Sequence, residues 1–153
     1  MSTVGTTAGT TVSVKAGAPA TYDAAGYGAL AYTVVGELTD AGGTDAKNNI
    51  VASRVLAYAG NQKFYAGFDN GKLSLQMRTD TDDAGQVIVK AAFVAGSKLA
   101  IKISLPNGDV SYCYALVESF NPSYGDAEKI ISSTATFDID SPQGTRYVDV
   151  PAA

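Results

Sequence analysis

The sequence contains no histidine, no tryptophan and only one cysteine, Cys113, among its 153 residues. Without histidine the chain lacks the commonest general base and the commonest metal ligand of proteins. A lone cysteine excludes an internal disulfide framework, and with no histidine to activate it we expect Cys113 to be a small buried thiol. These absences argue against an enzyme, and we expect no catalytic residues, no cofactor and no metal.

Charge is also scarce in this sequence. Charged residues make up 17% of the chain, and 15 acidic residues stand against 11 basic ones, a net charge of -4. This acidic balance argues against a general nucleic-acid-binding surface. The first residues lack a basic segment followed by an apolar one, so we expect no secretory signal. No apolar run approaches the roughly 18 residues of a membrane-spanning helix, so we expect no membrane partner.

The clearest structural pattern that is present lies in the C-terminal half. Apolar side chains alternate with small or polar ones over residues 99–105, which predicts a strand with Ile101 and Ile103 on its buried face. A Pro-Asn-Gly-Asp sequence follows at 106–109 and favours a tight reversal, because Asn-Gly tolerates positive φ. Residues 110–117 alternate again, so this stretch is expected to be a long hairpin.

An acidic segment precedes this hairpin. Three aspartates between residues 80 and 83 offer N-cap oxygens, apolar residues then recur at helical spacing, and Gly96 stands where a helix would end. We therefore expect a short flanking α-helix over about residues 82–95, with a strand as the alternative because the run 87–89 is β-branched. The same aspartates resemble part of a calcium loop, but alanines occupy the later positions where oxygen ligands are required.

The remaining patterns complete a mainly β fold. Further strands are expected at residues 10–15, 30–39, 72–78 and 130–139, with Tyr32, Val34 and Leu38 on one face of the second. About seven short strands and one helix predict a β-sandwich or partly closed barrel with a flanking helix. We expect a single domain over residues 1–153. It has a flexible N-terminal arm at 1–9, a polar loop at 40–49 and a C-terminal arm at 141–153; residues 21–29 read as a loop.

Two other groups of residues have side chains that could carry chemistry. Glu118 and Glu128 could form a carboxylate pair for glycoside hydrolysis, but nothing in the sequence places them near one another, and surface charge is the favoured interpretation. Aromatic residues gather between positions 58 and 68 and could stack on sugars. Packing in a core or an interface is the commoner use of such residues. They are Tyr58, Phe64, Tyr65 and Phe68.

The order of elements resembles the tail tube proteins of long-tailed bacteriophages, of the kind found in lambda. That family shows a short helix ending in an aromatic residue, a strand, a Pro-Asn-Gly turn, a return strand, a loop and a last long strand. Here these places are taken by residues 86–93, 99–105, 106–108, 110–119 and 130–139. The resemblance covers the C-terminal half, whereas the N-terminal half is similar to the family only in general character.

The resemblance implies a structural virion protein of the phage tail. Its copies would form hexameric rings that stack into a hollow tube, through which the genome passes at ejection without specific binding of DNA. Its partners would be other copies of itself and other tail proteins at the tube ends, after assembly in the host cytoplasm. The alternative is a carbohydrate-binding β-sandwich module of a phage or bacterial surface protein.

Two sets of residues would serve such an assembly. The resemblance implies that the polar loop contacts the adjacent ring through Asp40, Gly42, Gly43, Asp45, Lys47, Asn48 and Asn49. An acidic wall would repel the DNA backbone and keep friction low, so we expect carboxylates on the inner surface of the tube. The acidic residues on or near strands that are available for this are Glu118, Glu128, Asp138 and Asp140.

Overall fold

The computed structural model describes residues 8–43, 45–125, 127–128 and 130–151, so most of the N-terminal arm predicted at 1–9 lies outside the described residues. The strands are β1 Thr11–Ala16, β2 Thr33–Val34, β3 Leu38–Asp40, β4 Lys47–Ser53, β5 Gln62–Asp69, β6 Lys72–Arg78, β7 Lys98–Ser104, β8 Val110–Ser123, β9 Ser132–Ile139 and β10 Val148–Val150. The helices are α1 Ala24–Gly28 and α2 Ala84–Ala95, and a 3₁₀ turn spans Pro142–Gly144.

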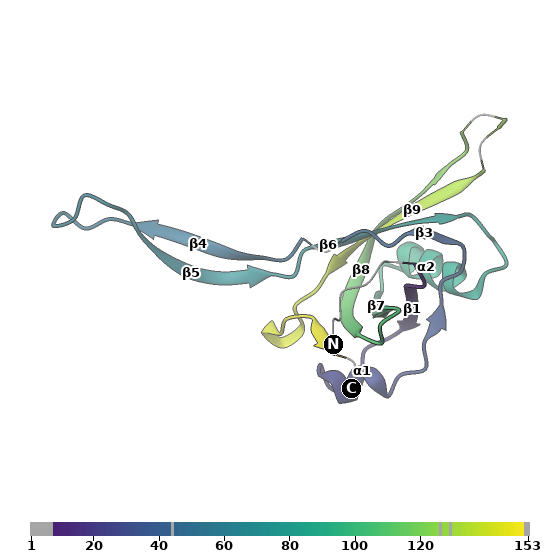
Figure 1. The fold of residues 1–153 in the computed structure, drawn as a ribbon, viewed down its shortest axis with the longest axis horizontal. Coiled ribbons are helices and arrows are strands. Elements are labelled where there is room, and N and C mark those ends of the chain that lie inside the picture. Colours follow the sequence, from purple (N-terminus) through teal and green to yellow (C-terminus); the bar gives the residue numbers. More distant parts are fainter. Residues whose placement is uncertain (1–7, 44, 126, 129, 152–153) are drawn as a thin grey trace.

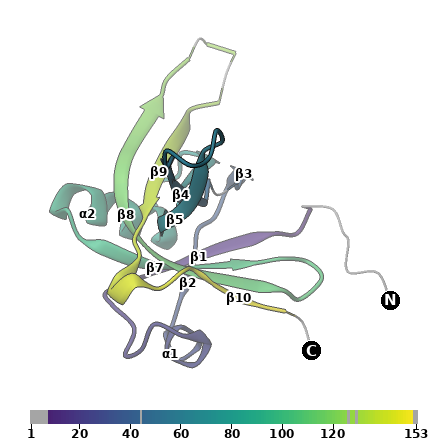
Figure 2. The ribbon, with the colours of Figure 1, turned by 90° about the vertical axis from the view of Figure 1, so that its left-hand side faces the viewer.

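One antiparallel sheet organises the molecule. Its strands run in the order β2-β1-β7-β8-β9-β6-β3. The long strand β8 pairs with β10 near its start, where Val148 lies opposite Tyr112, and with β9 from Ala115 onward. The sheet curls strongly, and Figure 2 shows β8 curving along its length. The predicted partly closed barrel with a flanking helix is confirmed.

The hydrophobic core lies on the concave side of this sheet. The alternation predicted for β6 and β9 is confirmed, because Leu75 and Phe137 are fully buried while Ser74 and Thr136 point to the other side. Helix α2 covers the concave side with Val89 and Ala92. The buried cluster comprises Val12, Val14, Val35, Leu73, Leu75, Met77, Val89, Ala92, Leu99, Ile101, Cys113, Ala115, Ala135, Phe137 and Ile139.

Helix α2 begins and ends as its sequence predicts. The carboxylate of Asp83 accepts a hydrogen bond from the backbone N–H of Gln86 at 3.0 Å, and Gly96 ends the helix with φ 70. The strand alternative for this segment is therefore wrong. The same carboxylate accepts the N–H of Gly36 at 3.0 Å, and the Gln86 side chain donates to the carbonyls of Gly36 and Arg78. The start of the helix thus ties the β2–β3 connection to the end of β6.

These hydrogen bonds to Gly36 explain why the prediction of one strand over residues 30–39 is wrong, both in the length of the strand and in which side chains are buried. Only Thr33–Val34 and Leu38–Asp40 are strands, separated by a bend at which Glu37 has φ 58. Val35 is buried in the core, whereas Val34 is exposed. A side chain at Gly36 would meet the Asp83 carboxylate, so the bend needs glycine there.

A second, smaller cluster lies on the convex side of the sheet. Residues 21–29, expected to be a loop, contain helix α1, whose N-cap Asp23 accepts from the N–H of Gly26 at 2.8 Å. The ring of Tyr27 stacks on that of Tyr112 at 5.7 Å, and the hydroxyl of Tyr32 donates to the Tyr27 carbonyl. Ala100 is fully buried beneath them, so the β7–β8 hairpin is covered on both faces.

The structure shows which side chains of the β7–β8 hairpin face the main core and which face the convex cluster. Ile101 is in the core as predicted, whereas Ile103 is only half-buried. On β8 it is Cys113 and Ala115 that face the main core, and Tyr112 belongs to the convex cluster. The expected buried cysteine is confirmed, because Cys113 is only 5% exposed, and this burial raises the pKa of its thiol to about 12.

We expect Ile101→Ala to lower the free energy of unfolding by about 2–5 kcal/mol, because it opens a cavity in a fully buried site. Lys102→Ala, one residue along the same strand, should lower it by less than about 1 kcal/mol, because half-buried Lys102 loses only its contact with the Tyr32 ring. Urea denaturation followed by circular dichroism measures both. Equal midpoints for the two variants would show that the assigned faces of β7 are wrong.

Candidate assembly surface

A long hairpin projects away from the sheet and offers the most unusual surface of the molecule (Figure 1). It consists of β4 and β5, which pair only with each other among the described strands. We name residues 47–69 the arm. Nearly every residue of the arm is exposed, including the apolar ones. An isolated two-stranded hairpin is only marginally stable in water, so a hairpin of this kind gains stability where another surface covers it.

The apolar side chains of the arm are the strongest sign of an interface. Tyr65 is 78% exposed and Leu56 is fully exposed, at 108%. Tyr58 and Phe64 are also exposed, so the aromatic residues of this stretch do not contribute to the core of the single chain. Exposed apolar patches of this kind mark protein interaction sites. The other exposed apolar residues of the arm are Ile50, Val51 and Val55.

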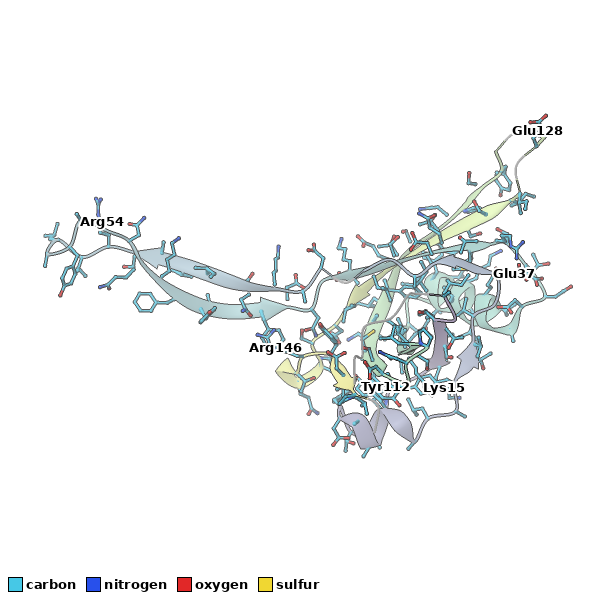
Figure 3. The ribbon with its side chains drawn as sticks, viewed as in Figure 1. Lys15, Glu37, Arg54, Tyr112, Glu128 and Arg146 are labelled. Carbon is cyan, nitrogen blue, oxygen red and sulfur yellow. The ribbon has the colours of Figure 1, made fainter. Side chains whose placement is uncertain are left out.

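The base of the arm is held by the C-terminal segment. The guanidinium of Arg146 lies 4.1 Å from the centre of the Phe68 ring and donates a hydrogen bond of 2.7 Å to the Asn48 side-chain oxygen. Figure 3 shows Arg146 below the arm near its junction with the body. The C-terminal arm expected at 141–153 is thus packed on the body over its described part, with β10 added to the sheet.

A buried amide completes this junction. The side-chain N–H₂ of Asn70 donates to the carbonyls of Asp140 and Thr145 and to the hydroxyl of Ser141, at 3.0 to 3.2 Å. At the neighbouring Gly71, with φ 84, an added Cβ would overlap the backbone of Asp45. The Asp-Asn-Gly turn between β5 and β6 therefore fixes where the arm leaves the sheet.

The residues expected to form an assembly loop do not lie in one loop. Asp40 ends β3, and its carboxylate accepts the N–H of Gly42 at 2.8 Å. Gly42 has φ 60 and lies so close to the backbone of Ser74 on β6 that a Cβ would not fit. The remaining members are divided between the connection that follows, with Gly43 and Asp45, and the start of β4. Those on β4 are Lys47, Asn48 and Asn49.

The carboxylates proposed for an inner wall have lysine neighbours. Glu118 forms an ion pair with Lys72 at 3.0 Å, and Asp138 lies opposite Lys72 in the β6–β9 register. Hydrogen bonding to Glu118 raises the pKa of Lys72. Asp140 pairs with Lys98 at 2.8 Å and likewise raises its pKa.

Glu128 lies apart from these groups, beyond the end of β8 at the outer end of the β8–β9 hairpin (Figure 3). The structure therefore does not bring Glu118 and Glu128 together as a catalytic pair. Among the described residues, no three acidic or cysteine side chains gather in a way that would hold a metal. Neither described helix is both long and apolar enough to cross a membrane.

The convex face of β6 and β9 is polar. Its side chains are those that alternate with the core residues, and the charged members are Lys72, Arg78 and Asp138. Arg78 forms an ion pair with Glu37. The uncharged ones are Ser74, Gln76, Ser132, Thr134 and Thr136. The period of two that predicts the inner residues of these strands also implies this polar outer face, of which the sequence singled out Asp138.

Comparison with known proteins finds a similar fold among solved structures but no similar sequence. No protein-family model and no curated protein matches the sequence. Among solved structures, the fold is similar to that of a chain in the cryo-EM structure of the anti-feeding prophage baseplate, which was symmetrised sixfold. The TM-score is 0.65 at 11% sequence identity, and the match covers 92% of this chain and 94% of that chain. The two chains share a fold over nearly their whole length.

We expect Arg146→Ala to loosen the arm without unfolding the body, because the ring contact and the hydrogen bond to Asn48 are both lost. Together they are worth about 1–2 kcal/mol, a factor of roughly 5–30 in local opening. Trypsin cleavage after Lys63 in the arm, followed by mass spectrometry, should be faster by that factor. Lys90→Ala on α2 is the control, and equal cleavage rates for the two variants would contradict the assigned role of Arg146.

Proposed function

We propose that this chain is a structural protein of a phage tail, whose copies assemble into hexameric rings that stack into a hollow tube for genome passage. The observation that carries the proposal is the exposed apolar arm, whose strands pair with no other described strand and whose apolar side chains from Ile50 to Tyr65 are exposed. A single chain gains nothing from such a surface, whereas copies in a ring or stack bury it. The fold shared with a chain of a sixfold-symmetrised phage-type baseplate supports this proposal.

The rest of the molecule fits the same role. The protein would act through contacts with its own copies and with other tail proteins in the virion, without enzymatic activity. Its polar convex face on β6 and β9 would line the inner wall. That face offers hydroxyl and amide groups. Lys72 is paired with Glu118 and Arg78 with Glu37, whereas Asp138 forms no ion pair among the described residues, so its negative charge remains. A wall of this kind repels a DNA backbone weakly and binds it nowhere, as passage requires.

Negative-stain electron microscopy of the concentrated, purified protein tests the proposal, and rings or hollow tubes are expected. Tyr65→Ser should abolish or strongly reduce them, because it removes an apolar group that assembly would bury. Val94→Ser on α2 is the matched control, since Val94 is 76% exposed but lies away from the arm, and it should assemble as the parent does. Monomers only, at every concentration, would favour the carbohydrate-binding alternative.

In a structure of the assembled tube, we expect net negative potential on the inner surface, supplied by Glu118 and Asp138. A double Glu118→Gln, Asp138→Asn variant should still assemble but bind duplex DNA more tightly at low salt. Gel mobility of DNA mixed with each tube measures this. A parent tube whose inner surface is dominated by Lys98 and Lys102 would contradict the assigned inner face.

A further inference from the structure

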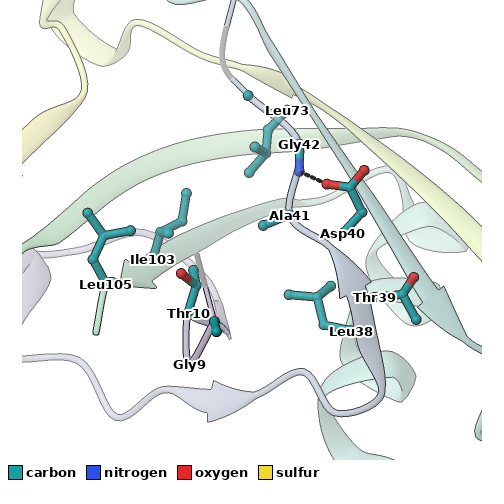
Figure 4. Close-up of a pocket in the computed structure, with 12 residues that line it drawn as sticks. Gly9, Thr10, Leu38, Thr39, Asp40, Ala41, Gly42, Leu73, Ile103 and Leu105 are labelled. Atoms are coloured by element: carbon teal, nitrogen blue, oxygen red, sulfur yellow. Dashed lines mark hydrogen bonds between the residues drawn. The ribbon is translucent and has the colours of Figure 1, made fainter. Parts of the chain in front are cut away.

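A groove with a cavity volume of about 480 Å³ lies where the curled sheet fails to close, between β3 with its following connection and the start of β1 (Figure 4). Its walls are apolar, and one carboxylate, that of Asp40, lies at its edge. The hydroxyl of Thr10 is shielded from solvent there and has no hydrogen-bond partner among the described residues. The apolar side chains that line the groove are Leu38, Ala41, Leu73, Ile103 and Leu105.

The tip of the arm, residues 54–61, has a matching composition. It presents Val55, Leu56 and Tyr58 as exposed apolar side chains. Its single charge is that of Arg54, which forms no ion pair within the part of the chain that the structure describes. Figure 3 shows Arg54 near the far end of the arm, well away from the body.

We propose that the groove receives the arm tip of a second copy of this chain, with Leu56 between the apolar walls and Arg54 facing Asp40. This inference rests on the proposed self-assembly and adds the surface that the arm meets. The tip cannot reach the groove of its own chain, because the arm points away from the body (Figure 1). One copy therefore offers a tip, the next a groove, and the contact repeats from copy to copy.

Charge favours the same partner. Within the arm Lys47, Arg54 and Lys63 stand against Asp69 alone, whereas acidic residues outnumber basic ones 15 to 11 in the chain as a whole. The acidic excess therefore lies in the body, and the arm of one copy is attracted to the body of another. One complementary charge pair at the edge of an apolar contact also sets the orientation of the tip in the groove.

Disulfide capture between two variants tests the contact. Leu56→Cys protein is mixed with Leu105→Cys protein at the groove rim and oxidised, and the linked peptides are identified by mass spectrometry. A disulfide needs Cα atoms within about 4.4–6.8 Å, so it reports the docked geometry. The native Cys113 is only 5% exposed and does not compete. We expect the Leu56→Cys and Leu105→Cys pair to link at least fivefold more than a pair of Ile130→Cys, on the other exposed hairpin, with Leu105→Cys. Equal yields would overturn the proposal.

A charge exchange provides the second measurement. Adding Arg54→Asp to the tip variant should lower the cross-link yield about tenfold, and adding Asp40→Arg to the groove variant should then restore it. An Arg54→Asp tip that links as well as the parent overturns the assigned pair. Tubes that form without the tip-to-groove link would overturn this contact and leave the proposed function standing. Linked copies that form open chains, but no rings or tubes, would support the contact and count against the tube.

Discussion

The structure depends on a β-sheet that curls without closing. Strand β8 exchanges partners along one edge, from β10 to β9, while β7 follows its other edge. The curvature this requires gives the sheet a concave side deep enough to hold a core that α2 covers. It also leaves β2 and β3 as unpaired edges and carries the β8–β9 hairpin beyond the sheet (Figure 2). The free edges and the groove between them follow from incomplete closure.

The stability of the molecule is consequently uneven. The core side chains of β6, β7 and β9 are fully buried, whereas the arm has no core of its own and is fastened only at its base. Arg146 and Asn70 supply that fastening from the C-terminal segment and the β5–β6 turn. A hairpin held in this way opens locally at low cost, and it becomes ordered when a neighbour covers its apolar face. Its exposed aromatic rings therefore cost free energy in water, and a neighbour that covered them would remove that cost.

The sequence predicts the parts of the fold that local pattern controls. Period-two alternation identified β6, β7 and β9, and the acidic cap with Gly96 located α2. Local sequence pattern is misleading where contacts between residues far apart in the chain determine the structure. Val35 rather than Val34 is buried because Asp83 and Gln86 bind Gly36 from far along the chain. The aromatic residues of the arm could not be assigned to core or interface, because both environments select the same residue types. The residues of the expected assembly loop are likewise divided, because β3 pairs with β6 whereas β4 pairs with β5.

The direct junction between β5 and β6 links the two surfaces that the proposed function requires. Only the Asn70-Gly71 turn separates the exposed arm from a strand with one buried and one polar face. The buried side-chain amide of Asn70 holds that turn in place, and the connection from β3 to β4 lies against β6 at Gly42. The direction of the arm is therefore set relative to the polar face of β6 and β9. In a ring whose polar faces point inward, every arm would leave in the same direction relative to the axis. A rigid turn, rather than a flexible linker, would thus let one chain specify both the lining of a channel and the orientation of its contacts with neighbouring copies.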